Sequence, residues 1–424
     1  MCCGLSQFLQ FQLYIGLLHD DLFWKCCFVY VVIILDPAAR GAYNKHIKQK
    51  GLNRLDFLAP CLFGTEGLLA DELRRMGAQE VLAENGAVLF SGGDDLLARA
   101  NICSRIAERI LVVVGNFEAH DFEQLFSQVR ALPWERYIGS RDAFPVKGWS
   151  LHSTLHSVSD CQSIIKKAIV ERLKPHYGIQ WFEESGAKNQ IQFSAMKNRF
   201  RLMIDTSGEG LHKRGYRAQA TAAPIKETLA AAMAYAARIY PDSVMYDPFC
   251  GSGTILIESA LIANHIAPGL HRGFAAQGLP WVKQTVWRQE LDRALSDIRR
   301  TSDFKATGSD IDPQALKLCE RNAMKAGVGS CIRTVQADIR DFTPDDGKGL
   351  VITNPPYGER LLDVQAAQRL YRVMGRRFIP QRGWRYYIIS PDEQFETLFG
   401  KKADKRRKLY NGMIKCQLYM YFKR

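Results

Sequence analysis

A glycine turn between a short apolar segment and a helix-like segment constrains the fold of this chain more than any other feature. Residues 247–254 (DPFCGSGT) form the turn, 244–246 (VMY) predict a strand before it, and 255–263 predict a helix after it. A strand, a Gly-x-Gly turn and a helix together bring backbone N–H groups against a nucleotide-like ligand. The sequence therefore predicts an α/β fold with a ligand site at a strand end.

The turn is not a complete dinucleotide fingerprint. Leu256 occupies the place of the third glycine, so the turn is weak evidence for NAD and requires no bound pyrophosphate. It suits the nucleoside end of another cofactor, although a turn of this kind on its own can be purely structural.

A second motif, Asn354-Pro355-Pro356-Tyr357, follows the predicted strand 350–353 (LVIT). The side-chain oxygen of Asn354 and the backbone carbonyl of Pro355 can accept both N–H groups of an exocyclic amine. Paired prolines stiffen the loop, and Tyr357 offers a flat face to a base. Alone, this run is no more than a rigid turn about as often as not. Beside the glycine turn it indicates methyl transfer from S-adenosylmethionine to an exocyclic nitrogen.

Two further predicted strands end in carboxylates, at 306–312 (ATGSDID) and 332–338 (IRTVQAD). Asp312 stands before a proline, which favours a helix N-cap. Asp310 then remains for the ribose hydroxyls, and Asp338 for the adenine amino group. Both carboxylates could instead be polar residues that simply end a strand.

Three segments resemble the THUMP-domain 23S ribosomal RNA guanine-N2-methyltransferases: 210–217 (GLHKRGYR), 223–229 (APIKETL) and 354–360 (NPPYGER). The resemblance extends from about Leu55 to the last residue. It implies a ferredoxin-like plus THUMP RNA-binding region (α+β), then a Rossmann-like class I S-adenosylmethionine-dependent methyltransferase domain (α/β), and no metal. We expect an atypical apolar extension at 1–54, the RNA-binding region at 55–206 and the catalytic domain at 207–424.

The resemblance carries site residues over to matching positions of this sequence. The implied target-base contacts are Asn354, Pro355, Pro356 and Tyr357. The implied cofactor contacts are Asp247, Phe249, Gly251, Gly253, Thr254, Asp310, Ile311, Asp338 and Asn354, with Lys226 and Glu227 as weaker candidates.

The chain is basic, with a formal net charge of +13. This charge suits a polyanionic partner, which the resemblance implies is large-subunit ribosomal RNA, although many soluble proteins are mildly basic. Basic clusters can contact phosphates or merely form a solvated face. The candidate RNA contacts in these clusters are Lys197, Arg199, Lys213, Arg214, Arg217, Lys401, Lys402 and Arg406.

The 11 cysteines are scattered without a Cys-x-x-Cys pair, so neither a zinc site nor a disulfide framework is expected. A reducing, cytoplasmic location is the simplest expectation. The apolar stretch 22–35 contains Lys25 and is short for a membrane span, and it lacks the features of a signal peptide. We interpret it as the result of a start codon assigned too far upstream, with translation beginning downstream of this stretch. The alternative is a genuine extra strand or a membrane anchor.

The remaining pattern predicts alternating elements. Predicted strands lie at 58–63, 87–90, 109–116, 144–149, 190–193 and 200–205, and predicted helices at 67–76, 94–101, 122–132, 160–173 and 221–239. An insertion at 264–305 separates the first two catalytic strands, and we expect its Trp281 and Trp287 to pack rather than to bind RNA.

The expected reaction is direct transfer onto a guanine that is flipped out or unpaired. Three alternatives remain: an adenine-N6 methyltransferase on DNA or RNA, a non-catalytic RNA-binding assembly factor, and an NAD-dependent oxidoreductase. The missing third glycine argues against the last of these. Whether the chain is a monomer or a homodimer stays open.

Overall fold

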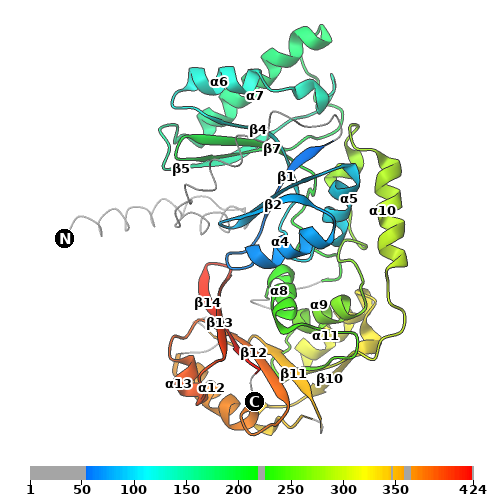
Figure 1. The fold of residues 1–424 in the computed structure, drawn as a ribbon, viewed down its shortest axis with the longest axis vertical. Helices are drawn as coiled ribbons and strands as arrows, with labels where there is room; N and C mark the ends of the chain where they lie inside the picture. Colours follow the sequence, from blue (N-terminus) through cyan, green and yellow to red (C-terminus); the bar gives the residue numbers. More distant parts are fainter. Residues whose placement is uncertain (1–53, 218–224, 345–346, 358–363, 423–424) are drawn as a thin grey trace, which may run out of the picture. The chain divides into compact units, whose positions relative to one another are not determined.

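The computed structural model describes residues 54–217, 225–344, 347–357 and 364–422. The apolar stretch 22–35 lies outside these residues. Within the described residues the strands form two seven-stranded sheets, which Figure 1 shows as separate groups of arrows. No helix in the described ranges is both long enough and apolar enough to cross a bilayer.

The first sheet belongs to the N-terminal region and has the strand order β2-β3-β1-β4-β7-β6-β5. Because β1 pairs with both β3 and β4, and β4 pairs with β7, one continuous sheet joins the two α+β modules of this region. Its strands are β1 (Leu55–Pro60), β2 (Gln79–Glu84), β3 (Ala87–Gly92), β4 (Leu111–Glu118), β5 (Val146–Leu151), β6 (Ile191–Met196) and β7 (Arg199–Asp205), and its helices are α4 (Glu66–Arg75), α5 (Asp94–Cys103), α6 (Phe122–Arg130) and α7 (Val158–Tyr177).

The second sheet has the order β10-β9-β8-β11-β12-β14-β13. The pairs from β10 to β12 are parallel, and β14 is antiparallel to both of its neighbours. Its strands are β8 (Val244–Asp247), β9 (Lys305–Asp310), β10 (Ile332–Gln336), β11 (Gly349–Thr353), β12 (Trp384–Ser390), β13 (Lys405–Asn411) and β14 (Ile414–Tyr421), and the helices are α8 (Glu227–Ala237), α9 (Thr254–Ala263), α10 (Gln284–Ser296), α11 (Pro313–Lys325), α12 (Val364–Phe378) and α13 (Phe395–Phe399).

The order of this sheet reverses at β8, which lies between β9 and β11. In a doubly wound sheet the carboxyl ends of the strands on either side of such a switch point leave a crevice for a ligand. Asp247, Asp310 and Thr353 are the last residues of β8, β9 and β11. The topology therefore gathers the motifs found in the sequence at one edge.

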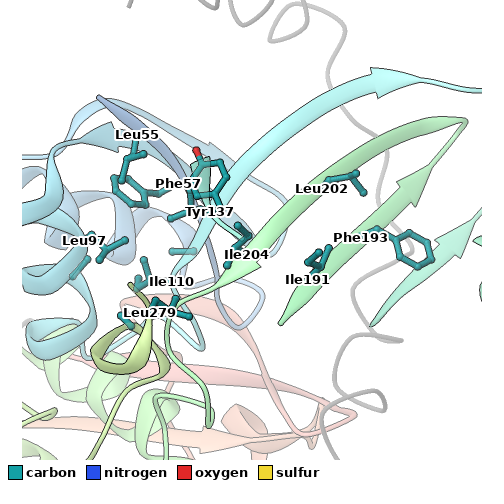
Figure 2. Close-up of a cluster of buried hydrophobic side chains, with 14 of the residues drawn as sticks. Leu55, Phe57, Leu97, Ile110, Tyr137, Ile191, Phe193, Leu202, Ile204 and Leu279 are labelled. Atoms are coloured by element: carbon teal, nitrogen blue, oxygen red, sulfur yellow. The ribbon is translucent and has the colours of Figure 1, made fainter. Parts of the chain in front are cut away.

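The main buried cluster crosses the expected domain boundary. Figure 2 shows Phe57 of β1 and Phe193 of β6 among its members, together with Leu279 from the 264–305 insertion. Trp287 of α10 is 3 % exposed and belongs to the same cluster, while the Trp281 Nε1–H donates to Asn189 Oδ1 at 3.0 Å. Both tryptophans pack as expected, but they pack against the N-terminal region.

Several expected boundaries need correction. The strand expected at 58–63 corresponds to β1, which ends at Pro60. The next residue, Cys61, donates its N–H to the Gly86 carbonyl outside the strand. Of the helix expected at 221–239, residues 221–224 lie outside the described residues. The helix itself spans only Glu227–Ala237, since Arg238 has a φ of +55°. The expected N-cap is confirmed, because Asp312 accepts the Gln314 N–H at 2.8 Å.

Two helical glycines provide a matched test of packing. A Cβ at Gly375 in α12 would collide with the Phe399 carbonyl oxygen and lie 2.7 Å from its carbon, whereas a Cβ at Gly67 in α4 would meet no described atom within 4 Å. We expect Gly375→Ala to lower the free energy of unfolding by about 1–3 kcal/mol. Gly67→Ala should change it by less than about 1 kcal/mol. Urea denaturation measures the free energy of unfolding of both variants. Equal changes in the two would contradict the close packing of Gly375 against Phe399.

Candidate active site

Asp247 joins the two motifs. It ends β8 and is 1 % exposed. Its Oδ1 accepts the Thr353 hydroxyl at 2.7 Å and the Phe249 N–H at 3.2 Å. Because Thr353 immediately precedes Asn354, this one carboxyl oxygen holds the start of the glycine turn against the start of the Asn-Pro-Pro-Tyr motif.

The glycine turn has a backbone that glycine adopts more readily than other residues. Gly251 and Gly253 have φ values of +51° and +82°, in the left-handed region. A Cβ at Gly253 would collide with the Cys319 sulfur, whereas a Cβ at Gly251 would meet no described atom within 4 Å. The turn is therefore packed on one side and open on the other, and Thr254 begins α9 directly after it.

Asp310 is held by backbone donors. Its Oδ2 accepts the Gly251 N–H at 3.0 Å, and its Oδ1 accepts the Asp312 N–H at 3.0 Å. The next side chain, Ile311, is 68 % exposed. A fixed carboxylate beside an exposed apolar side chain and an open glycine backbone can take a ribose and the flat ring attached to it.

Asp338 has a partner of its own. Arg340 donates to its two carboxyl oxygens at 3.0 and 2.7 Å, and this hydrogen bond lowers the pKa of Asp338. The Arg340 side chain is 74 % exposed, so an adenine amino group would have to share or displace it. The expected contact with adenine stays a prediction.

Asn354 carries an unsatisfied acceptor. Its Oδ1 is buried and accepts no hydrogen bond from any described residue. Leaving a buried acceptor unpaired costs about 1–3 kcal/mol, so this oxygen is suited to a donor that arrives with a ligand. Pro355 is buried and Pro356 is half-buried beside it.

Tyr357 is more enclosed than the sequence suggested. The residue is 9 % exposed and belongs to the buried cluster that contains Cys416. Its hydroxyl oxygen accepts the Asn411 Nδ2–H at 2.7 Å and lies 3.7 Å from the Cys416 sulfur. The flat face that we expect to stack on a base is therefore largely enclosed, and the contact of Tyr357 with the target base stays a prediction.

Two expected RNA contacts form ion pairs within the protein, and Arg214 is buried while Arg217 is half-buried. Arg214 is 3 % exposed and pairs with Glu258 of α9 at 3.4 Å, so its guanidinium group cannot reach a phosphate at the surface. Arg217 donates to the Thr254 hydroxyl at 2.8 Å and pairs with Glu227 at 3.3 Å. Both arginines support the glycine turn and its helix.

The other expected RNA contacts lie nearer the surface. Lys213 pairs with Glu209 at 2.9 Å, and Arg406 donates through Nε to Glu396 at 2.7 Å. Arg199 is half-buried at the start of β7. Lys213 is exposed, as are Lys197, at the turn between β6 and β7, and Lys401 and Lys402, before β13.

Sequence reasoning missed Thr353 and Asn411. A threonine at the end of an otherwise apolar strand was a signal for the first, because its buried hydroxyl needs a partner. The Asn411-Gly412 pair was a signal for a hairpin turn, but not for a contact with Tyr357.

Profiles of known families match the three parts of the chain. The RlmL ferredoxin-like domain matches residues 56–111, the THUMP domain matches 119–205, and the RMKL-like methyltransferase domain matches 214–420. The putative RNA methyltransferase YpsC of Bacillus subtilis is 41 % identical over 373 residues, which are 88 % of this chain and 97 % of that protein. The chain belongs to the RMKL-like methyltransferase family. The expected family and fold class are thus confirmed, whereas the expected domain bounds stay predictions.

Two other relatives define the extent of this similarity. The ribosomal RNA large subunit methyltransferase K/L of Syntrophotalea carbinolica is 33 % identical over 384 residues, and the chain spans 53 % of its length. The crystal structure of SMU.472, a putative methyltransferase complexed with SAH, is 39 % identical with a TM-score of 0.83, and the match covers 88 % of this chain and 99 % of that one.

A metal centre has no support in the described ranges, where no three His, Cys, Asp or Glu side chains gather as ligands. The expectation that this family member works without a metal stays a prediction.

Asp247 predicts a pH-dependent stability. Burial raises the pKa of its carboxyl to about 7, although hydrogen bonds from Thr353 and the Phe249 N–H favour the ionised form. The unfolded chain releases this proton near pH 4, so stability should fall as the pH rises from about 4 to about 7. Asp247→Asn keeps the acceptor oxygen and should remove this loss. Urea denaturation at pH 5 and pH 8 measures the free energy of unfolding of the wild type and of Asp247→Asn. The same change with pH in the two proteins would contradict the prediction.

Proposed function

We propose that this chain transfers a methyl group from S-adenosylmethionine to the exocyclic N2 of a guanine in large-subunit (23S) ribosomal RNA. The observation that carries the proposal is the buried Asn354 Oδ1, which accepts no hydrogen bond within the part of the chain that the structure describes. The hydrogen bond between Thr353 and Asp247 fixes this acceptor beside the glycine turn. An amine acceptor next to a nucleoside-type site is the arrangement that N-methylation requires.

The described residues fit the cofactor. Gly251 offers an open backbone, Asp310 a fixed carboxylate and Ile311 an exposed apolar surface. These three residues would hold the nucleoside, and SMU.472, whose fold is matched over most of both chains, was crystallised with SAH. When bound, S-adenosylmethionine supplies an electrophilic methyl group.

Asn354 and Pro355 would hold the target amine. The two N–H groups of the amine would donate to Asn354 Oδ1 and to the Pro355 carbonyl, which turns the nitrogen lone pair toward the methyl group. Tyr357, which is 9 % exposed, would contact the target base beside this acceptor pair. The residues act by positioning, and we assign no general base.

Three observations favour RNA as the substrate. The chain carries a net charge of +13, a THUMP domain at 119–205, and exposed lysines at Lys197, Lys401 and Lys402. YpsC is named a putative RNA methyltransferase, and the K/L relatives are named for large-subunit ribosomal RNA. We propose the same substrate for this chain, together with the cytoplasmic location that this substrate implies in bacteria. We propose that the chain acts as a monomer or a homodimer.

Tritium transfer from labelled S-adenosylmethionine tests the proposal. The substrates are unmodified ribosomal RNA and DNA, followed by nucleoside chromatography. Label in N2-methylguanosine from large-subunit RNA is the expected result. Label in N6-methyladenine would overturn the substrate, and no transfer with bound cofactor would favour a non-catalytic RNA-binding protein.

Asn354→Ala should remove most of the activity. We expect kcat to fall by roughly 100-fold or more, because the amine loses an acceptor that exists only in the assembled site. The dissociation constant for SAH should change little. Asn116→Ala in β4 is the amide control and should keep wild-type kcat. Normal activity in Asn354→Ala would refute the proposed role.

Asn411 should act through the Tyr357 hydroxyl, to which it donates at 2.7 Å. Losing this hydrogen bond should lower kcat by roughly fivefold in Asn411→Ala and by a similar factor in Tyr357→Phe. The double variant should be no worse than either single one, because both remove the same contact. Multiplicative losses in steady-state kinetics would show that Asn411 has another role.

A further inference from the structure

A buried carboxylate of the N-terminal region contacts residues at the start of α8. Glu108 lies between α5 and β4 and is 6 % exposed. Its Oε1 accepts the Thr228 hydroxyl at 2.6 Å. Its Oε2 lies 3.1 Å from His212 Nδ1 and 3.4 Å from Lys226 Nζ. These partners come from the segment before α8 and from the first turn of that helix.

Glu108 is ionised despite its burial. Burial opposes the charge, but the hydrogen bond from His212 and the charge of Lys226 outweigh it, and they hold the pKa of Glu108 well below its usual range. A buried charge of this kind is strongly destabilising when it loses its partners. The groups around Glu108 are therefore held firmly in place.

From these groups a chain of contacts reaches the glycine turn. Lys226 precedes α8, whose first residue, Glu227, pairs with Arg217 at 3.3 Å. The same guanidinium group donates to the Thr254 hydroxyl at 2.8 Å. Thr254 is the first residue of α9 and the last residue of the turn.

A second, parallel set of contacts ends on the same helix. Arg214 donates to the carbonyl of Arg105, three residues before Glu108, and pairs with Glu258 of α9 at 3.4 Å. The Tyr216 hydroxyl also donates to Glu258, at 3.1 Å. Residues 105–108 of the N-terminal region are thus linked to α9 through Arg214, and to the last residue of the turn, less directly, through the start of α8 and Arg217.

We propose that Glu108 is a positioning residue for the glycine turn. The N-terminal region would then complete the cofactor site, in addition to any contact it makes with RNA. The inference rests on the proposed function for the identity of the cofactor. It differs from a general stabilising role because it assigns to one carboxylate an effect on cofactor affinity.

The chain offers a matched control in a second ion pair between the same parts. Arg99 of α5 donates to both carboxyl oxygens of Glu290 in α10, at 2.7 and 2.6 Å. Glu290 is 8 % exposed. This pair joins the N-terminal region to the 264–305 insertion, so its loss removes a comparable interaction without touching the contacts that reach Thr254.

The experiment measures SAH binding by calorimetry and Tm by differential scanning for the full chain, Glu108→Gln and Glu290→Gln. We expect Glu108→Gln to weaken SAH binding by roughly tenfold, since Lys226 and His212 lose the charge that orients them. Glu290→Gln should lower Tm while its Kd for SAH stays within about twofold of the wild type.

Thr228→Val keeps the side-chain shape and removes only one donor to Glu108, so it serves if Glu108→Gln fails to fold. We expect it to weaken SAH binding by roughly fivefold. The proposal would be overturned if Glu108→Gln bound SAH with wild-type affinity. If only Thr228→Val folds, wild-type affinity of that variant for SAH would overturn it instead. An equal loss of SAH affinity in Glu290→Gln would also overturn it. A wild-type chain that binds no SAH would overturn both this inference and the proposed function, whereas binding without methyl transfer would overturn the proposed function alone.

Discussion

The hydrogen bond from Thr353 to Asp247 is the interaction on which the site depends. It joins the carboxyl ends of β11 and β8, two parallel neighbours at the point where the strand order reverses. One partner leads into the glycine turn and the other into Asn354. Because the bond is buried, water does not compete for it, and the distance between the glycine turn and Asn354 is set by the sheet.

Buried and partly buried ion pairs also hold the segment before α8 and the start of α9 in place. Arg214, Arg217 and Glu108 are buried or largely buried, and each has a charged partner. Charges are costly to bury and are tolerated when paired with good geometry. Arg214 and Arg217 therefore act within the protein, where they connect the segment before α8 to α9.

The sequence predicted residues whose roles are local. Asp312 caps the helix that follows it, and the turns at Gly251 and Gly253 adopt the conformation that glycine permits. It failed where the deciding partner is distant in the chain. Asn411 and Tyr357 are 54 residues apart, and nothing in the letters around Arg214 identifies Glu258 as its partner.

The same limit applies to the fold. Periodicity located most strands of the N-terminal region, while β2 and the elements after Tyr357 were not anticipated. The insertion appeared to belong to the catalytic domain because of its position between β8 and β9. Its packing was decided by apolar surface that only the folded N-terminal sheet provides.

That packing changes what a domain boundary near residue 206 means. Leu279 and Trp287 lie C-terminal to the boundary but fill the core on the other side of it. A fragment cut at this point would leave large apolar side chains facing water and would tend to self-associate. The two parts are consecutive in sequence, yet they share one buried cluster, so an exchange of either part between relatives should keep the insertion together with the N-terminal sheet.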